Sequence, residues 1–206
     1  MKFSKTPLLK TNRLVIKLLE PPEVPLMVDF RLSNKLHLRE WEPSRSPDFY
    51  TERFWSVQSK LATKQFQDGK SVCLIIMNLS ASQILGVCNY TNIVRGTFQS
   101  CHLGYSIDQA NEGRGIMFEA LKTSNQFIFE HIKLHRIMAN YIPRNKRSAS
   151  LLQRLGFVIE GRAESFMKIN GVWEEHILTS LINSEYSCII YRIFNNRTNR
   201  IGVPTA

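Results

Sequence analysis

Two periodicities in the apolar and polar positions divide the chain into strands and helices. Alternation with a period of two predicts strands at residues 13–19 and 101–107, and an unbroken apolar run predicts a buried strand at 72–77. After a turn at 78–82, residues 84–90 are predicted to return as the partner of that strand. Helical spacing predicts helices from the prolines at 21–25 to about residue 36, from about 50 to 67, and from 115 to about 132. Further strands at 136–141, 158–169 and 172–182 complete a mixed α/β domain.

Three local features refine this outline. The helix at residues 50–67 is predicted to pack its Phe54, Val57, Leu61 and Phe66 side chains inward. The strand at 136–141 should run parallel to the strand at 101–107, because a helical crossover joins them. Asn170-Gly171 predicts a two-residue turn between the last two strands.

The stretch from residue 101 to 122 joins a strand to a helix through Gly113-Arg114-Gly115. Glycines let the backbone approach a ligand closely, and the free N–H groups of the first helical turn favour an anion. A phosphate-binding P-loop needs Lys-Ser/Thr after the second glycine, but Ile116 and Met117 follow here. A Rossmann turn needs three glycines. A pyrophosphate cradle without a magnesium ligand remains, as coenzyme A requires.

Two motifs carry a family resemblance. Glu112-Gly113-Arg114-Gly115-Ile116-Met117 resembles the Gln/Arg-Gly-x-Gly-x-Gly/Ala signature of the GNAT N-acetyltransferases, although Glu112 and Met117 depart from it. The Asn145-Lys146-Arg147-Ser148 helix start, followed by Gly156-Phe157, resembles the second signature of the family. Residues 8–183 are similar to the ribosomal-protein-alanine N-acetyltransferases of bacteria (RimJ type), while residues 184–206 form an extension with an expected edge strand at 188–191 and a mobile tail.

The resemblance implies a GNAT acyl-CoA N-acyltransferase fold, with a central mixed, mostly antiparallel sheet flanked by helices. It also implies acetyl transfer from acetyl-CoA, as cosubstrate, to the N-terminal alanine of a ribosomal protein on the assembling small subunit. We assign the cofactor contacts to the end of one strand, the glycine turn and a helix start: Tyr105, Ser106, Ile107, Glu112, Gly113, Arg114, Gly115, Ile116, Met117, Asn145 and Ser148.

Catalytic residues are harder to assign, because Leu152 stands where many members of the family carry a tyrosine that acts as the general acid. Ser148 is the expected replacement at the departing sulfur, with a simple helix-start role as the alternative. Glu42, His102 and Glu164 are the candidates for the base, and the sequence does not choose among them. An α-amine, with an ordinary pKa of about 7.7–8.0, needs less help from a base than a lysine at about 10.4. The histidines show no ligand spacing, so we expect no metal.

Composition limits the setting. The 206 residues have a formal net charge of +10, with 14 basic and 9 acidic residues in 1–110 and 13 and 8 in 111–206. This even spread predicts no nucleic-acid-binding arm and no sequence-specific nucleic acid contact, although it favours approach to an RNA-rich particle. No apolar run approaches the ~20 residues of a membrane span, and the start lacks the apolar core of a signal peptide. Cysteines without a CxxC pair favour a reducing cytoplasm.

Two other functions fit the same scaffold. A small-amine or antibiotic acetyltransferase would use the same glycine turn, but it should present a more acidic acceptor pocket. A ribosome-associated binding factor would use the fold for contact alone, and the intact Gly113 to Gly115 turn with Asn145 and Ser148 favours catalysis over this reading. The oligomeric state is not predicted.

Overall fold

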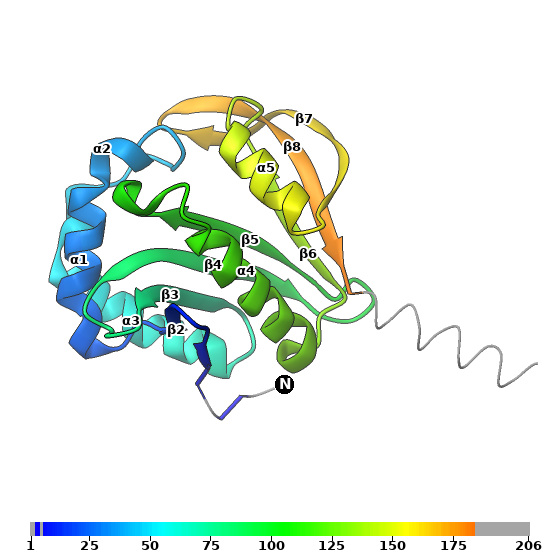
Figure 1. Ribbon diagram of the computed structural model, residues 1–206. Coiled ribbons are helices and arrows are strands. Elements are labelled where there is room, and N and C mark those ends of the chain that lie inside the picture. The colour runs from blue at the N-terminus through cyan, green and yellow to red at the C-terminus, as the bar shows by residue number, and fades with distance from the viewer. Residues whose placement is uncertain (1–2, 5, 184–206) are drawn as a thin grey trace, which may run out of the picture.

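The computed structural model describes residues 3–4 and 6–183, and these form one domain built on a single sheet (Figure 1). The expected edge strand at 188–191 and the tail that follows it lie outside the described residues. The sheet has eight strands in the order β1-β2-β3-β4-β5-β6-β8-β7. The strands are β1 (Leu8–Lys10), β2 (Leu14–Leu18), β3 (Val72–Asn78), β4 (Ile84–Val94), β5 (Ser100–Ile107), β6 (Arg136–Tyr141), β7 (Val158–Ile169) and β8 (Val172–Ile182).

Helices cover both faces of this sheet. The α-helices are α1 (Val24–Ser33), α2 (Lys35–Leu38), α3 (Glu52–Gln67), α4 (Ile116–Phe127) and α5 (Lys146–Arg154). A π-helical turn, η4 (Ile128–Ile132), extends α4, and short 3-10 turns η1 (Pro21–Glu23), η2 (Pro47–Tyr50) and η3 (Gln109–Asn111) lie in the connections. Figure 1 shows α4 and α5 in front of the sheet and α1 beside α3 on its other side.

The pairing confirms the predicted mixed, mostly antiparallel sheet. Each neighbouring pair is antiparallel except β5 and β6, which run parallel as the α4 crossover requires. The predicted hairpin is also confirmed, since Ile169 pairs with Val172 across Asn170 and Gly171, both at positive φ. Strand β1 and helix α2 were not predicted, because each is too short to show a period.

Two apolar clusters hold the helices on the two faces. Neighbouring residues of a strand point to opposite faces. Accordingly Ile16 belongs to the cluster under α4, with Leu121, and Val15 to the cluster under α1, with Phe30. All four side chains are less than a tenth exposed. The sheet therefore separates two apolar cores, one under α4 and one under α1.

A buried polar network ties β4 to α4. The Tyr90 side chain is fully buried, and its hydroxyl lies 2.7 Å from both the Ser124 hydroxyl and the Asn125 side-chain carbonyl. The Ser124 hydroxyl also donates to the Ala120 backbone carbonyl at 2.8 Å. Because buried polar groups are costly when unpaired, this network fixes the position of α4 on the sheet.

The predicted inner face of α3 is partly wrong. Val57 and Leu61 are 58% and 42% exposed, whereas Ser59 and Phe66 are buried and Trp55 packs against the α1 cluster. The Trp55 indole N–H donates to the Phe49 carbonyl at 2.7 Å. This bond and the ring contacts with Phe49 and Phe54 turn the helix so that a small serine faces the core.

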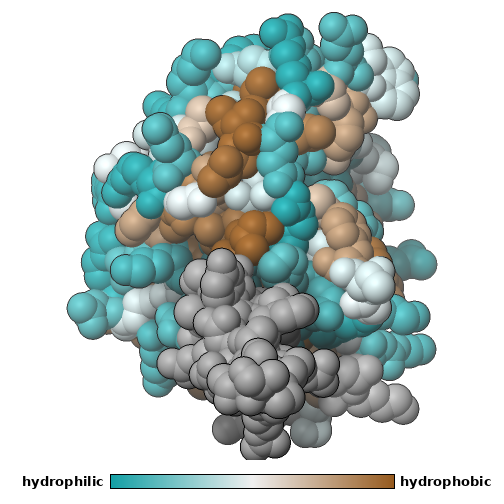
Figure 2. Space-filling model, turned by 90° about the vertical axis from the view of Figure 1, so that its right-hand side faces the viewer, coloured by the Kyte–Doolittle hydropathy of each residue, from teal (hydrophilic) through white to brown (hydrophobic). Residues whose placement is uncertain are grey.

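The surface mixes polar and apolar side chains. Figure 2 shows the face at the right of Figure 1, where apolar side chains form small patches separated by polar ones. Within the described part of the chain, no helix is long and apolar enough to cross a membrane.

Candidate active site

A gap in the sheet is the centre of the candidate site. Strands β5 and β6 pair only through Ser100–His102 and Arg136–Met138. Beyond His102 the two strands diverge: β5 continues to Ile107 along β4, and β6 continues to Tyr141 along β8. The facing backbone edges of β5 and β6 therefore offer N–H and C=O groups to an extended ligand between them.

The glycine turn lies at the open end of this gap. Gly113 and Gly115 have φ values of +72° and +73°, a conformation that favours glycine, and Gly115 caps α4 without a side-chain cap. The Glu119 N–H donates to the Gly115 carbonyl at 3.1 Å, which leaves the N–H groups of Ile116 and Met117 without helical partners. A cluster of free N–H groups at a helix start fits the expected pyrophosphate.

Side chains from distant elements brace this turn. Glu112 forms an ion pair with Arg147 of α5 through one carboxylate oxygen. Its other carboxylate oxygen lies 3.2 Å from His37 Nε2 of α2. The Arg13 guanidinium donates to the Arg114 carbonyl at 3.1 Å and to the Glu119 carboxylate. Neither His37 nor Arg13 was predicted as a site residue, and no local pattern distinguishes them.

Tyr105 and Ser148 meet across the gap. The Tyr105 hydroxyl of β5 lies 2.5 Å from the Ser148 hydroxyl in the first turn of α5. Burial raises the pKa of Tyr105 to about 12, so its hydroxyl keeps its proton at neutral pH. Asn145 caps α5, because its side-chain carbonyl accepts the Ser148 backbone N–H at 3.0 Å. The two predicted residues Tyr105 and Ser148 thus form one hydrogen-bonded pair.

Leu152 cannot replace that pair. It is 1% exposed and belongs to the core under α4 and α5. Leucine has no proton to give, whereas Tyr105 and Ser148 both carry a hydroxyl.

The remaining strand residues divide between the two faces. Tyr105 and Ile107 face α4 and α5, while His102 and Ser106 point to the opposite side of the sheet. Burial lowers the pKa of His102, which favours the neutral ring. Its Nδ1 and the Ser106 hydroxyl are buried without a hydrogen-bond partner among the described residues. His102 therefore keeps the lone pair that a base needs.

The other two base candidates stand in different surroundings. Both carboxylate oxygens of Glu42 are bonded to guanidinium groups, Oε1 to Arg31 at 3.1 Å and Oε2 to Arg45 at 3.0 Å. Glu164 is exposed in a bulge of β7, between the pairs that Ala163 and Met167 make with β8. Each of the three candidates remains a prediction.

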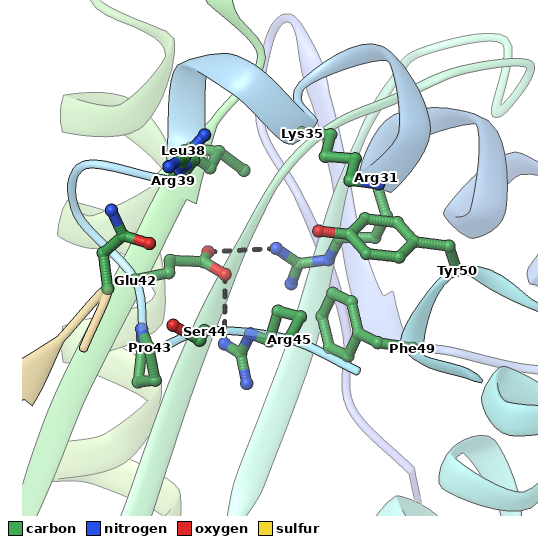
Figure 3. Close-up of a pocket in the computed structure, with 11 residues that line it drawn as sticks. Arg31, Lys35, Leu38, Arg39, Glu42, Pro43, Ser44, Arg45, Phe49 and Tyr50 are labelled. Atoms are coloured by element: carbon green, nitrogen blue, oxygen red, sulfur yellow. Dashed lines mark hydrogen bonds and ion pairs between the residues drawn. The ribbon is translucent and has the colours of Figure 1, made fainter. Parts of the chain in front are cut away.

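A cavity of about 290 Å³ adjoins Glu42 (Figure 3). Its lining comes from α1, α2, the loop that follows them, and the β7–β8 turn: Arg31, Lys35, Leu38, Arg39, Glu42, Pro43, Ser44, Arg45, Phe49, Tyr50 and Asn170. The Asn170 backbone N–H donates to the Glu42 carbonyl at 3.2 Å, so the turn closes one side. Figure 3 shows the Glu42 carboxylate directed between the Arg31 and Arg45 guanidiniums.

Two cysteines of the sheet, Cys88 of β4 and Cys101 of β5, are buried. Burial raises the pKa values of Cys88 and Cys101 to about 12, so these thiols are not nucleophiles at neutral pH. Among the residues that the structure describes, no group of three or more His, Cys, Asp or Glu side chains is arranged to hold a metal ion.

The comparisons with known proteins agree with this geometry. Residues 13–158 match the acetyltransferase (GNAT) domain family. Over 179 residues the chain is 37% identical to the [ribosomal protein uS5]-alanine N-acetyltransferase of Escherichia coli, covering 87% of this chain and 92% of that protein. The chain belongs to the GNAT acetyltransferases, and it is an acetyltransferase.

Solved structures give the same picture. The ribosomal-protein-S5-alanine acetyltransferase of Vibrio fischeri is 36% identical and superimposes with a TM-score of 0.82, covering 85% of this chain and 96% of that one. Mycobacterium smegmatis RimJ, in complex with a coenzyme A disulfide, shares the fold with a TM-score of 0.78 at 23% identity, covering 84% of this chain and 83% of that one.

Proposed function

We propose that this enzyme transfers the acetyl group of acetyl-CoA to the N-terminal α-amine of a ribosomal protein that begins with alanine. The observation that carries the proposal is the Tyr105–Ser148 pair at the gap beside a glycine turn suited to a pyrophosphate. The names of the similar proteins from E. coli and V. fischeri support the acceptor. The site is expected to act in the cytoplasm, on the small subunit as it assembles.

The reaction needs few protein groups. The neutral α-amine attacks the thioester carbonyl, a C–N bond forms, the C–S bond breaks, and the amine loses a proton while the sulfur gains one. Free backbone N–H groups along β5 would polarise the carbonyl. Ser148 would donate its proton to the departing sulfur and receive another from Tyr105. The raised pKa of Tyr105 keeps that proton available at neutral pH. Holding both substrates in line supplies most of the remaining acceleration.

The base remains the least defined part of this mechanism. His102 has an unpartnered ring nitrogen, and its lowered pKa keeps the ring neutral, although burial also makes it a weaker base. Glu42 would have to leave one of its two guanidinium partners first. Glu164 would act from the exposed bulge of β7. Because an α-amine is already partly neutral at cytoplasmic pH, water could take the proton from it without a dedicated base.

A peptide competition tests the acceptor. One peptide begins with a free alanine and contains no lysine, and the other has a blocked terminus and one free lysine. After incubation with acetyl-CoA, fragmentation by mass spectrometry locates the acetylated atom. We expect the α-amine of alanine to be acetylated predominantly. Predominant acetylation of the lysine, or of a polyamine added at equal concentration, would favour the small-amine alternative.

A further inference from the structure

The cavity beside Glu42 has an unusual balance of charge. Its lining contains four cationic side chains, from Arg31, Lys35, Arg39 and Arg45, and one carboxylate, from Glu42. Two of the cations lie over aromatic rings. The Lys35 ammonium lies 4.6 Å from the Tyr50 ring centre, and the Arg45 guanidinium 4.5 Å from that of Phe49. The cavity therefore repels a cation and attracts an anion.

One of the four cations, Arg31, is buried in the protein. Its side chain is 6% exposed, and its Nη1 donates to Glu42. Its buried Nε has no hydrogen-bond partner among the described residues. A buried guanidinium with an unused donor is costly, and an anion entering the cavity would relieve that cost.

The cavity also lies next to the gap between β5 and β6. The Asn34 side-chain carbonyl, adjacent in sequence to Lys35, accepts the backbone N–H of Gln109 at 2.8 Å, and Gln109 follows β5 after a single residue. His37 of α2 also contacts Glu112 of the glycine turn. A polypeptide whose first residue reaches into the gap would thus pass the cavity with one of its next residues.

We propose that this cavity binds the carboxylate of an aspartate or glutamate that lies shortly after the first residue of the acceptor polypeptide. The proposal rests on the proposed function and names a second determinant of its substrate. A carboxylate fits better than a nucleic acid phosphate, because Glu42 already shows this group seated between two of the guanidiniums. The cavity is also small, at about 290 Å³, whereas phosphate backbones are bound along extended basic surfaces.

The test uses peptides that begin with alanine and carry a single glutamate, placed in turn at the second to the sixth position. Each has a partner with glutamine at the same place. Values of kcat/KM are measured for the wild type, for the double variant Lys35→Ala/Arg39→Ala, and for Lys60→Ala, which removes an exposed cation of α3 outside the cavity. Lys35 and Arg39 are chosen because neither takes part in the Glu42 ion pairs.

We expect glutamate at one position to raise kcat/KM about tenfold over glutamine, through KM, as a charge-assisted contact would. The double variant should lose this preference while acetylating the glutamine peptides as before, and Lys60→Ala should keep it. Equal values for glutamate and glutamine at every position, or a preference that survives in the double variant, would overturn the proposal.

Two further measurements test the carboxylate site separately from the proposed function. Calorimetry measures the binding of the same peptides in the presence of coenzyme A, even when no acetyl group is transferred. A glutamate preference in binding without any acetylation would therefore show that the proposed function fails while the cavity still binds a carboxylate. A short RNA oligonucleotide is added as a competitor. Competition by RNA that disappears in the double variant, together with no glutamate preference, would assign the cavity to nucleic acid instead.

Discussion

The hydroxyl of Tyr105 in β5 and the hydroxyl of Ser148 in α5 lie 2.5 Å apart, although 43 residues separate them in sequence. The bond spans the gap between β5 and β6 and connects a buried phenol to a serine at a helix start. In the proposed mechanism, a proton would reach the departing sulfur through this contact.

Removing either hydroxyl should therefore slow the same step. We expect Ser148→Ala to lower kcat by about 10²-fold, and Tyr105→Phe to have a similar effect, since general acids typically contribute ~10²–10⁴-fold. The double variant should be little worse than Ser148→Ala alone, because the two groups act as one unit. Single-turnover rates with saturating acetyl-CoA give the comparison. Changes below tenfold at Ser148, Glu42 and Glu164 alike would leave positioning of the substrates as the explanation.

The pH profile should show no loss of activity from the tyrosine in the accessible range. Burial raises the pKa of Tyr105 to about 12, so its proton is present below that value and lost only above it. We expect kcat to rise with pH as the amine loses its proton, and then to stay level to about pH 10. A fall of kcat on the alkaline side that Tyr105→Phe abolishes would contradict this assignment.

Coenzyme A binding should depend on Gly115. The residue has a φ of +73°, and a valine there would both strain the backbone and place a side chain beside the free N–H groups. We expect Gly115→Val to weaken coenzyme A binding by at least about tenfold, measured by calorimetry. Gly96→Val is the matched control, because Gly96 has a φ of +74° in a turn away from the site. Equal affinity in the folded Gly115→Val variant would refute the pyrophosphate assignment.

The ion pair at the start of α4 should make stability depend on pH. Burial alone would raise the pKa of Glu119, but hydrogen bonds from Thr11 and Arg13 outweigh it and leave the pKa lowered. The carboxylate thus stabilises the fold above its unfolded pKa of about 4.3, and this contribution disappears as the pH falls through the lower folded value. Urea unfolding should show Glu119→Gln about 1–2 kcal/mol less stable at pH 7, with a smaller difference near pH 3.

The Tyr90 network should be worth a measurable part of the stability. Tyr90→Phe removes the hydroxyl that bonds to Ser124 and Asn125 and leaves the Asn125 carbonyl unpaired inside the protein. We expect a loss of about 1–3 kcal/mol in the free energy of unfolding. Tyr50→Phe, at a partly exposed ring, should change stability little. Equal stability of the two variants would show that the network does not contribute.

Much of the fold was predictable from the sequence because periodicity is local. The order of the longer strands and helices, the parallel β5–β6 pair and the Asn170–Gly171 turn all follow from patterns within about 20 residues. The inner face of α3 was not predictable. A hydrogen bond from Trp55 to the Phe49 carbonyl sets the rotation of this helix, and helical spacing alone does not reveal that bond.

The site was predictable only in part, for a similar reason. The glycine turn and the Asn145 cap are contiguous motifs. The contacts of Ser148 with Tyr105, of Glu112 with His37, and of Glu42 with Arg31 join separate elements, so no spacing reveals them. Glu42 in particular was a candidate for the base, and the structure places it between the Arg31 and Arg45 guanidinium groups.

The divergence of β5 and β6 also bears on the kinetic order of the reaction. The opening passes through the sheet, with the glycine turn and Ser148 reached from the α4 side and the cavity next to α1 on the other. In the proposed binding mode the two substrates enter from opposite sides and do not displace each other. The buried cysteines Cys88 and Cys101 offer no thiolate to carry the acyl group between them. Donor and acceptor can thus be bound simultaneously in a ternary complex, and initial velocities should give intersecting instead of parallel double-reciprocal lines.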